Sequence, residues 1–83
     1  MNITEIYPLG KEVEYFGSTL IVPEWTKSIF TDSDGSVWCI SMDKRCVYFN
    51  GSVWIPDYEA QEFLVGCAEL GAFSAQDSLV EYD

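Results

Sequence analysis

Apolar and polar residues follow one another in short blocks along the chain, and turn-forming residues separate these blocks. The clearest example is the stretch 24–41, in which two β-rich runs, 27–31 and 36–41, flank Asp32-Ser33-Asp34-Gly35. Asp caps tight turns and Gly accepts a positive φ, so this pattern predicts a β-hairpin. The remaining chain is organised around this hairpin.

Strands of similar length precede and follow this hairpin. Pro23 fits the end of a strand, because proline lacks the amide donor that a central ladder needs. Asn50-Gly51 is the strongest two-residue hairpin signal, since both central residues of a type I′ turn need a positive φ. Residues 12–55 therefore read as an antiparallel meander. The expected strands are 12–16, 19–22, 27–31, 36–41, 45–49 and 52–55, with further turns at 17–19 and 42–44.

Residues 57–71 permit two interpretations. Asp57 after Pro56 could cap a helix, and apolar residues then recur at three-to-four spacing. The run FLVGCAEL suits a buried strand equally well, and Gly66 weakens both assignments. We favour a strand at 63–69 and keep a short helix near 57–70 as the alternative. The residues at helical spacing are Ala60, Phe63, Leu64, Cys67, Ala68 and Gly71.

A chain of 83 residues has room for one domain with one small core. We predict a mainly β fold, a small antiparallel meander of about five to seven short strands, with an α+β fold if the helix forms. A last short strand is expected at 78–82. The parts of the domain are a lead-in at 1–10, the meander at 12–55 and an acidic C-terminal part at 57–83.

Charge is the strongest global feature of the sequence. Fourteen Asp and Glu face four Lys and Arg, with no His, which gives a net charge of −10. Residues 46–83 contain seven acids and no base. Such a surface repels nucleic acids and anionic membranes and attracts proteins with basic faces, although solubility alone also explains it. The four bases are Lys11, Lys27, Lys44 and Arg45.

The cellular setting is read from the N-terminus, the hydropathy and the cysteines. The first residues lack the basic start and long apolar run of a signal peptide, and no apolar stretch approaches ~20 residues. The meander would bring Cys39 and Cys46 onto adjacent strands, where a disulfide is geometrically conceivable. We expect reduced thiols instead, because the cysteine number is odd, and therefore a cytoplasmic protein.

No catalytic, metal or cofactor site is predicted. Nucleophilic catalysis needs an activating base, and the chain has no His. Asp32-x-Asp34-Gly35 begins like a calcium loop, but the position of the twelfth-residue ligand is Asp43, across a predicted strand. Turn chemistry explains these residues, and three cysteines without His make a poor zinc site. We expect no enzymatic activity and no cofactor.

Two segments carry a resemblance to known proteins. Residues 23–38 read Pro-Glu-Trp-Thr-Lys, then Ile-Phe-Thr-Asp-x-Asp-Gly-x-Val-Trp, and residues 77–81 read Asp-Ser-Leu-Val-Glu. This order resembles small accessory proteins of tailed bacteriophages, which share a Pro-x-Trp-x-Lys lead, an Asp-x-Asp-Gly turn and a Ser-Leu-Val ending. The similarity covers about residues 20–83. It implies a phage origin and the bacterial host cytosol, implies no defined chemistry, and favours the strand at 63–69.

Carboxylates recur two positions apart in four places. On a strand such pairs point to one face, ~6.5–7 Å apart, which is comparable to neighbouring phosphates of a nucleic acid. These rows could imitate a phosphate backbone, although a solvated strand face explains any single pair more simply. The pairs are Glu12/Glu14, Asp32/Asp34, Asp57/Glu59 and Glu81/Asp83.

Two binding functions remain in view. The first is an acidic inhibitor that occupies a basic surface of a host nucleic-acid-handling or defence protein, conceivably by DNA mimicry, without binding nucleic acid itself. Its expected contact residues are Asp57, Glu59, Glu62, Glu69, Asp77, Glu81 and Asp83. The second is a non-catalytic interaction or self-assembly module with an aromatic patch that includes Trp25, Trp54 and Tyr58. Exposed strand edges make a homodimer conceivable.

Overall fold

The computed structural model describes residues 10–82, which form eight strands and two 3₁₀ helices. All strand pairs are antiparallel, so the predicted mainly β fold is confirmed. The lead-in predicted at 1–10 lies almost entirely outside the described residues. The elements are β1 (Lys11–Tyr15), β2 (Ser18–Val22), β3 (Ser28–Thr31), β4 (Ser36–Ile40), η1 (Lys44–Cys46), β5 (Val47–Phe49), β6 (Trp54–Pro56), β7 (Glu62–Cys67), η2 (Ala75–Asp77) and β8 (Val80–Glu81).

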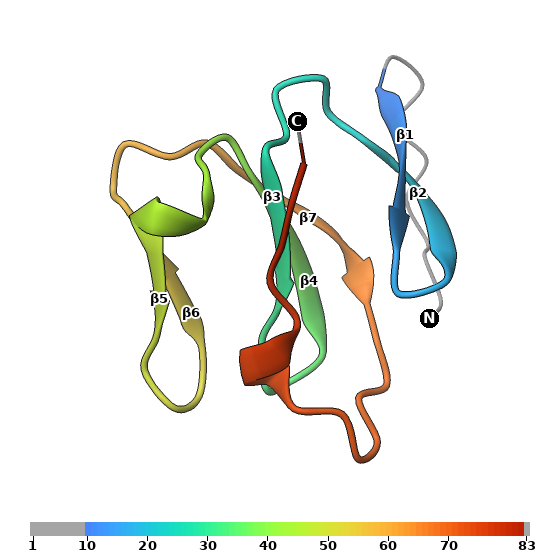
Figure 1. Ribbon diagram of the computed structural model, residues 1–83, viewed down its shortest axis with the longest axis vertical. Helices are drawn as coiled ribbons and strands as arrows, with labels where there is room; N and C mark the ends of the chain where they lie inside the picture. Colours follow the sequence, from blue (N-terminus) through green and yellow to red (C-terminus); the bar gives the residue numbers. More distant parts are fainter. Residues whose placement is uncertain (1–9, 83) are drawn as a thin grey trace.

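The strands form three sheets. A central four-stranded sheet has the order β7-β4-β3-β8, and the hairpins β1–β2 and β5–β6 are separate two-stranded sheets. Figure 1 shows β3 and β4 between these two hairpins. Each predicted hairpin forms, but the meander does not continue as one sheet. The second neighbour of β4 is β7, which lies far along the chain, in place of β5.

The chain leaves the central sheet after β4 because a 3₁₀ helix intervenes. Asp43 caps η1 by accepting a hydrogen bond from the amide of Arg45, at 3.0 Å. The expected neighbourhood of Cys39 and Cys46 is therefore wrong: Cys39 lies opposite Ile29 and Phe63. All three cysteines are free thiols, and burial raises the pKa of the Cys39 thiol to about 12.

The segment 57–71 contains a strand, β7 at Glu62–Cys67, where the favoured interpretation places one at 63–69. β7 pairs with β4 along its whole length, and the pairing skips Val65 at an irregularity between Val37 and Trp38. The alternative helix near 57–70 is wrong. Asp57 instead closes a turn, in which its side chain accepts from the amide of Glu59 at 3.1 Å and its carbonyl accepts from the amide of Ala60 at 3.0 Å.

Two turns differ from the sequence prediction. The two-residue hairpin turn is Phe16-Gly17, with φ of 46° and 82°, between the paired residues Tyr15 and Ser18. The turn expected at 17–19 therefore begins one residue earlier. The Asn50-Gly51 hairpin forms with a four-residue loop, because the Asn50 side chain accepts from the amides two and three positions ahead. A type I′ turn at Asn50-Gly51 was thus the wrong turn type.

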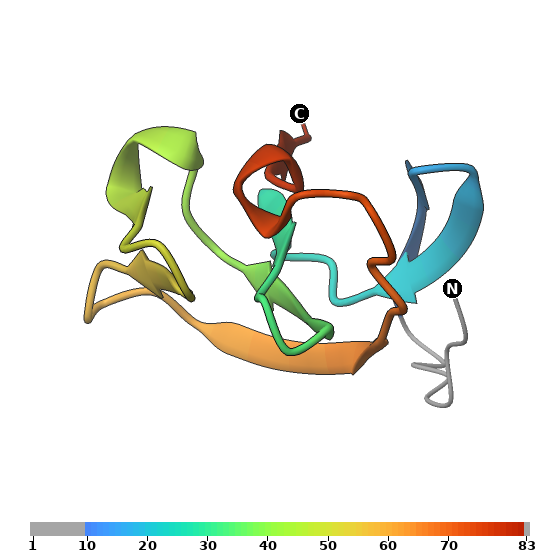
Figure 2. The same cartoon turned by 90° about the horizontal axis from the view of Figure 1, so that it is seen from below.

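Each face of the central sheet is covered by one hairpin, and Figure 2 shows the two hairpins on opposite sides of β3 and β4. Tyr15, Leu20 and Val22 of β1–β2 cover one face. On the other face, the Trp54 ring of β6 packs between Phe30 and Phe49, with ring centroids 6.0 and 5.1 Å away. Ile29, Val37, Cys39 and Val65 are the fully buried residues of the first face.

A buried hydroxyl network joins three distant segments of the chain. The Tyr15 hydroxyl donates to the carbonyl of Ser78 at 2.8 Å and lies 2.8 Å from the hydroxyl of Thr31. Because a phenol has one proton, Tyr15 accepts the hydrogen bond from Thr31. The Ser78 hydroxyl in turn accepts from the Thr31 amide at 2.8 Å. Burial raises the pKa of Tyr15, so it stays a neutral donor.

Replacing Tyr15 by Phe should destabilise the fold by about 1–3 kcal/mol, because the Ser78 carbonyl and Thr31 hydroxyl would stay buried without their partner. Urea unfolding followed by Trp fluorescence measures this loss. Tyr82→Phe is the matched control, since the Tyr82 hydroxyl makes one exposed hydrogen bond, to the Glu14 carbonyl. Equal losses in the two variants would contradict the structural role given to the buried network.

Gly35→Ala should be much more destabilising than Gly51→Ala. Both glycines have positive φ, 90° and 100°, but a Cβ at Gly35 would lie 2.3 Å from the Ala68 carbonyl oxygen, whereas Gly51 has open space. We expect a loss of about 1 kcal/mol at Gly51 from backbone strain and at least ~2 kcal/mol more at Gly35. Denaturant midpoints of both variants check this, and similar midpoints would refute the close approach.

Candidate functional site

The predicted acidic contact residues do not share one surface. Asp57 and Glu59 lie in the turn between β6 and β7, Glu62 begins β7, and Glu81 ends β8. Glu69 follows β7 and Asp77 ends η2, at the other end of the molecule (Figure 1). All six are exposed, and Asp83 lies outside the described residues.

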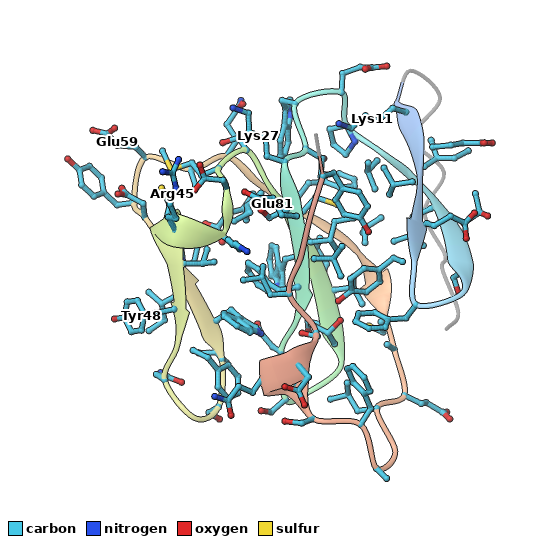
Figure 3. The ribbon with its side chains drawn as sticks, viewed as in Figure 1. Lys11, Lys27, Arg45, Tyr48, Glu59 and Glu81 are labelled. Atoms are coloured by element: carbon cyan, nitrogen blue, oxygen red, sulfur yellow. The ribbon has the colours of Figure 1, made fainter. Side chains whose placement is uncertain are left out.

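The four basic residues gather at one end of the fold. Figure 3 shows Lys11, Lys27 and Arg45 at the same end as Glu59 and Glu81. Lys44 is next to Arg45 in η1. We call the opposite end, where the hairpins turn, the turn end. It consists of residues 16–17, 32–35, 50–53 and 68–78.

The turn end contains carboxylates and, among the described residues, no base. Asp34, Glu69 and Asp77 are exposed there, and Asp32 is buried. Within residues 10–82 only one carboxylate is in an ion pair, Asp43 with Arg45 at 2.8 Å. The hydrogen bonds from Arg45 lower the pKa of the Asp43 carboxyl. The exposed carboxylates of the turn end therefore have no cation near them to offset their charge.

The paired carboxylates form a strand row in only one of the described cases. Glu12 and Glu14 are both exposed on β1, while Val13 is half-buried and Tyr15 is buried. Asp57 and Glu59 share a turn, as do Asp32 and Asp34. The last pair includes Asp83 and lies partly outside the described residues. The expected phosphate-like spacing thus applies to β1 alone among the described pairs.

Asp32 and Asp34 serve the structure of their turn, as turn chemistry predicts. Asp34 accepts from the amide of Ser36 at 2.9 Å, and this hydrogen bond lowers the pKa of its carboxyl. Asp32 accepts from the amide of Trp54 at 2.8 Å and so holds the β5–β6 hairpin against the central turn. Burial raises the pKa of the Asp32 carboxyl. Residues 10–82 contain no cluster of three or more acidic or thiol side chains that could bind a metal ion.

The three aromatic residues of the predicted patch are not brought together. Trp25 is partly buried and packs against the core. Trp54 packs between two rings, and its indole nitrogen donates to the Ala75 carbonyl at 3.0 Å, so packing explains this residue. Only Tyr58 is fully open to solvent, at 92% exposure.

A different pair of aromatic residues lines a pocket at the turn end. The pocket has a volume of about 170 Å³. The rings of Phe16 and Phe73 meet edge to face at its wall, with centroids 4.9 Å apart and an angle of 65°. Glu69 is the one residue of the lining with a full charge. The lining residues are Tyr15, Phe16, Thr31, Ala68, Glu69, Leu70, Phe73 and Ser78.

A second hollow lies on the β5–β6 hairpin, with a volume of about 280 Å³. Arg45 and Asp57 both line it, so it carries both signs of charge. Tyr48 at its border is 62% exposed and points away from the sheet in Figure 3. This hollow is wider, but its charges are balanced and it has one aromatic wall only.

Sequence reasoning missed Phe16 and Phe73. The signal for Phe16 was present: two residues, Phe16 and Gly17, separate two alternating runs that pair from Tyr15 to Ser18. Phe73 had no local signal, because its contact with Phe16 comes from the path of the chain after β7. Glu69 was predicted as a contact residue, but its place beside two phenylalanines was not.

Asp32 is both a hydrogen-bond acceptor for the Trp54 amide and a buried charge, and substitutions at pH 7 separate these two effects. Asp32→Asn keeps an oxygen acceptor for the Trp54 amide and removes a negative charge. The raised pKa of the Asp32 carboxyl indicates that burial disfavours this charge, so the stability of the variant should be unchanged or higher. Asp32→Ala should lose about 1–2 kcal/mol, because the acceptor is absent. Chemical denaturation of both variants tests this. Because the pKa of Asp32 is raised in the folded protein, protonation of this carboxyl favours the fold. The free energy of unfolding of the wild type should therefore rise relative to that of Asp32→Asn as pH falls towards 4.

The segments that resemble phage accessory proteins meet in the central sheet, where β8 pairs with β3. In residues 10–82 no helix has the length and apolar character needed to cross a membrane. Comparisons of the chain with known protein families, curated proteins and solved structures found no match, so the phage resemblance stays a prediction.

Proposed function

We propose that this protein is a non-catalytic, acidic binding protein that occupies a basic surface on another protein. The observation that carries the proposal is the set of exposed carboxylates without cationic partners; three of them, Asp34, Glu69 and Asp77, lie at the turn end, where no described base offsets them. If internal ion pairs used these charges, they would be unavailable to a partner. Together with the phage resemblance, this favours a host nucleic-acid-handling or defence protein in the bacterial cytosol, inhibited by the loss of its basic surface.

The turn end is the better candidate surface of the two ends. At the opposite end, Lys27 and Arg45 offset the field of Glu59 and Glu81. At the turn end, Asp34, Glu69 and Asp77 add without opposition. Summed fields of this kind raise association rates with oppositely charged partners and are sensitive to salt.

The turn end also has apolar surface that exposed charges alone would not supply. Phe16 is 53% exposed and Phe73 is 42% exposed, next to each other and to Glu69. Protein interfaces typically combine buried aromatic anchors with a polar rim, and most of the affinity comes from the anchors. DNA mimicry has less support than simple occupation, because the phosphate-like spacing applies to Glu12 and Glu14 alone among the described pairs.

Self-assembly is the second candidate function. β7 is an edge strand of the central sheet, and Leu64 on it is 44% exposed, so a further strand could add at this edge. The net charge of −10 opposes association of two copies at low salt. High salt would remove this opposition and favour self-assembly, whereas it would weaken binding to a basic partner.

Two charge reversals of equal size test the proposed surface. Glu69→Lys with Asp77→Lys at the turn end, and Glu59→Lys with Glu62→Lys at the other end, each change the net charge from −10 to −6, because each substitution adds two units. The tagged variants are used to capture proteins from a bacterial lysate at about 0.05 and about 0.5 M salt. We expect a basic nucleic-acid-binding protein that is retained at low salt, lost at high salt and displaced by DNA.

The turn-end variant should lose this captured protein by at least about tenfold more than the matched variant. Equal losses would show that net charge matters and the turn end does not. Retention of the captured protein at high salt would overturn the proposal. Capture of further copies of this chain and no other protein would also overturn it, and would favour self-assembly.

A further inference from the structure

The pocket at the turn end has an aromatic wall that the fold leaves uncovered. The side chains of Phe16 and Phe73 contact each other, and roughly half of each remains open to solvent. Leu70 adds further apolar lining. An occupant of the pocket would remove this apolar surface from water, which is favourable in proportion to the area covered.

The wall is held in place before any occupant arrives. Phe16 has a φ of 46°, which is strained for a bulky side chain, and strained residues of this kind persist where the surrounding structure fixes them. Its neighbour Tyr15 is anchored by two buried hydrogen bonds. On the other side of the pocket, the Ala68 amide donates to the Gly35 carbonyl at 2.7 Å. A preformed pocket loses little conformational freedom on binding.

The electrostatics of the pocket select for positive charge. Glu69 is the one charged residue of the lining, and Tyr15 is a neutral phenol. All four basic residues lie at the opposite end, so none in the described chain offsets Glu69. An anion would be repelled here, and a neutral apolar group would leave the carboxylate unused.

We propose that this pocket seats one lysine or arginine side chain from the basic partner; the identity of the donor as a partner protein rests on the proposed function. The aliphatic stem would pack against Phe16 and Phe73, and the cationic group would lie near the Glu69 carboxylate and the electron-rich faces of the rings. A volume of about 170 Å³ suits a single long side chain. The pocket is then the anchor of the interface, and Asp34 and Asp77 belong to its acidic rim.

The test uses small probes that represent the side chain alone. n-Butylguanidinium and n-butylammonium are titrated into the ¹⁵N-labelled protein, with n-butylurea as the neutral analogue of the same shape. We expect saturable shifts in the amide signals of residues 16–17 and 68–73, with millimolar affinity because the probes are small. n-Butylurea should bind about 3–10 times more weakly than n-butylguanidinium.

Three variants separate charge from shape. Glu69→Gln should weaken the binding of n-butylguanidinium about threefold or more and leave the binding of n-butylurea unchanged. Glu62→Gln removes one charge at the opposite end and should change the affinity for neither probe. Phe16→Gly should weaken the binding of both probes. The fold should survive, because glycine adopts a φ of 46° without strain.

The inference is overturned if n-butylurea binds as tightly as n-butylguanidinium, if Glu69→Gln has no effect, or if the shifted amides lie at residues 57–62 and 81. Each of these outcomes is read without any partner protein. The inference can therefore fail while the turn-end charge reversal still abolishes capture, and the proposed function would then stand on its acidic rim alone. Conversely, a selective pocket with no salt-sensitive partner would leave the cation site valid and remove the proposed function. Concentration-dependent dimers that n-butylguanidinium dissociates would assign the side chain to a second copy and refute a separate partner.

Discussion

The hydroxyl of Tyr15 is the interaction on which the arrangement of this small fold depends. It joins the end of β1 to Thr31 of β3, which is 16 residues further along the chain, and to Ser78 between η2 and β8, which is 63 residues further along. Without it, the β1–β2 hairpin would be held by apolar packing, which is not directional, and by the exposed hydrogen bond from the Tyr82 hydroxyl to the Glu14 carbonyl. The hydrogen bonds fix where the hairpin sits. They thereby fix the position of Phe16, one residue further along the chain, at the mouth of the pocket.

The fold places its four bases at one end and makes little use of charge for stability, since residues 10–82 contain a single ion pair, Arg45 with Asp43. Successive hairpins return the chain to the same end, and the bases occur about once per hairpin, at Lys11, at Lys27 and at Lys44 with Arg45. All of them therefore lie at one end, and the turns collect at the other. Apart from the buried Asp32, the carboxylates of the turn end are exposed, and within residues 10–82 none of them is in an ion pair. Their mutual repulsion opposes folding slightly, and their value, if any, is realised when another molecule is present.

Local sequence chemistry predicted the hairpins well, because each depends on turn residues and alternation within about ten positions. Asp34 specifies its turn by accepting a hydrogen bond from the Ser36 amide, and Gly35 does so by adopting a positive φ. Partner choice between distant strands has no such local code, so the sequence could not show that β4 pairs with β7 in place of β5. The same limit explains the site. The exposure of Glu69 followed from its charge, but its position beside Phe16 and Phe73 depends on long-range contacts.

The order of strands in the central sheet has a consequence for synthesis. β3 and β4 occupy its middle, whereas both edges come from the last third of the described chain, β7 and β8. A chain emerging from the ribosome can form its three hairpins early, but the carbonyl of Ser78 that anchors Tyr15 emerges after all three of them. During translation the outer edges of β3 and β4 therefore stay unpaired, and Val65 is missing from the core around Ile29 and Val37. Complete folding must follow the emergence of β7 and β8, and until then the nascent chain exposes unpaired strand edges that are prone to aggregate.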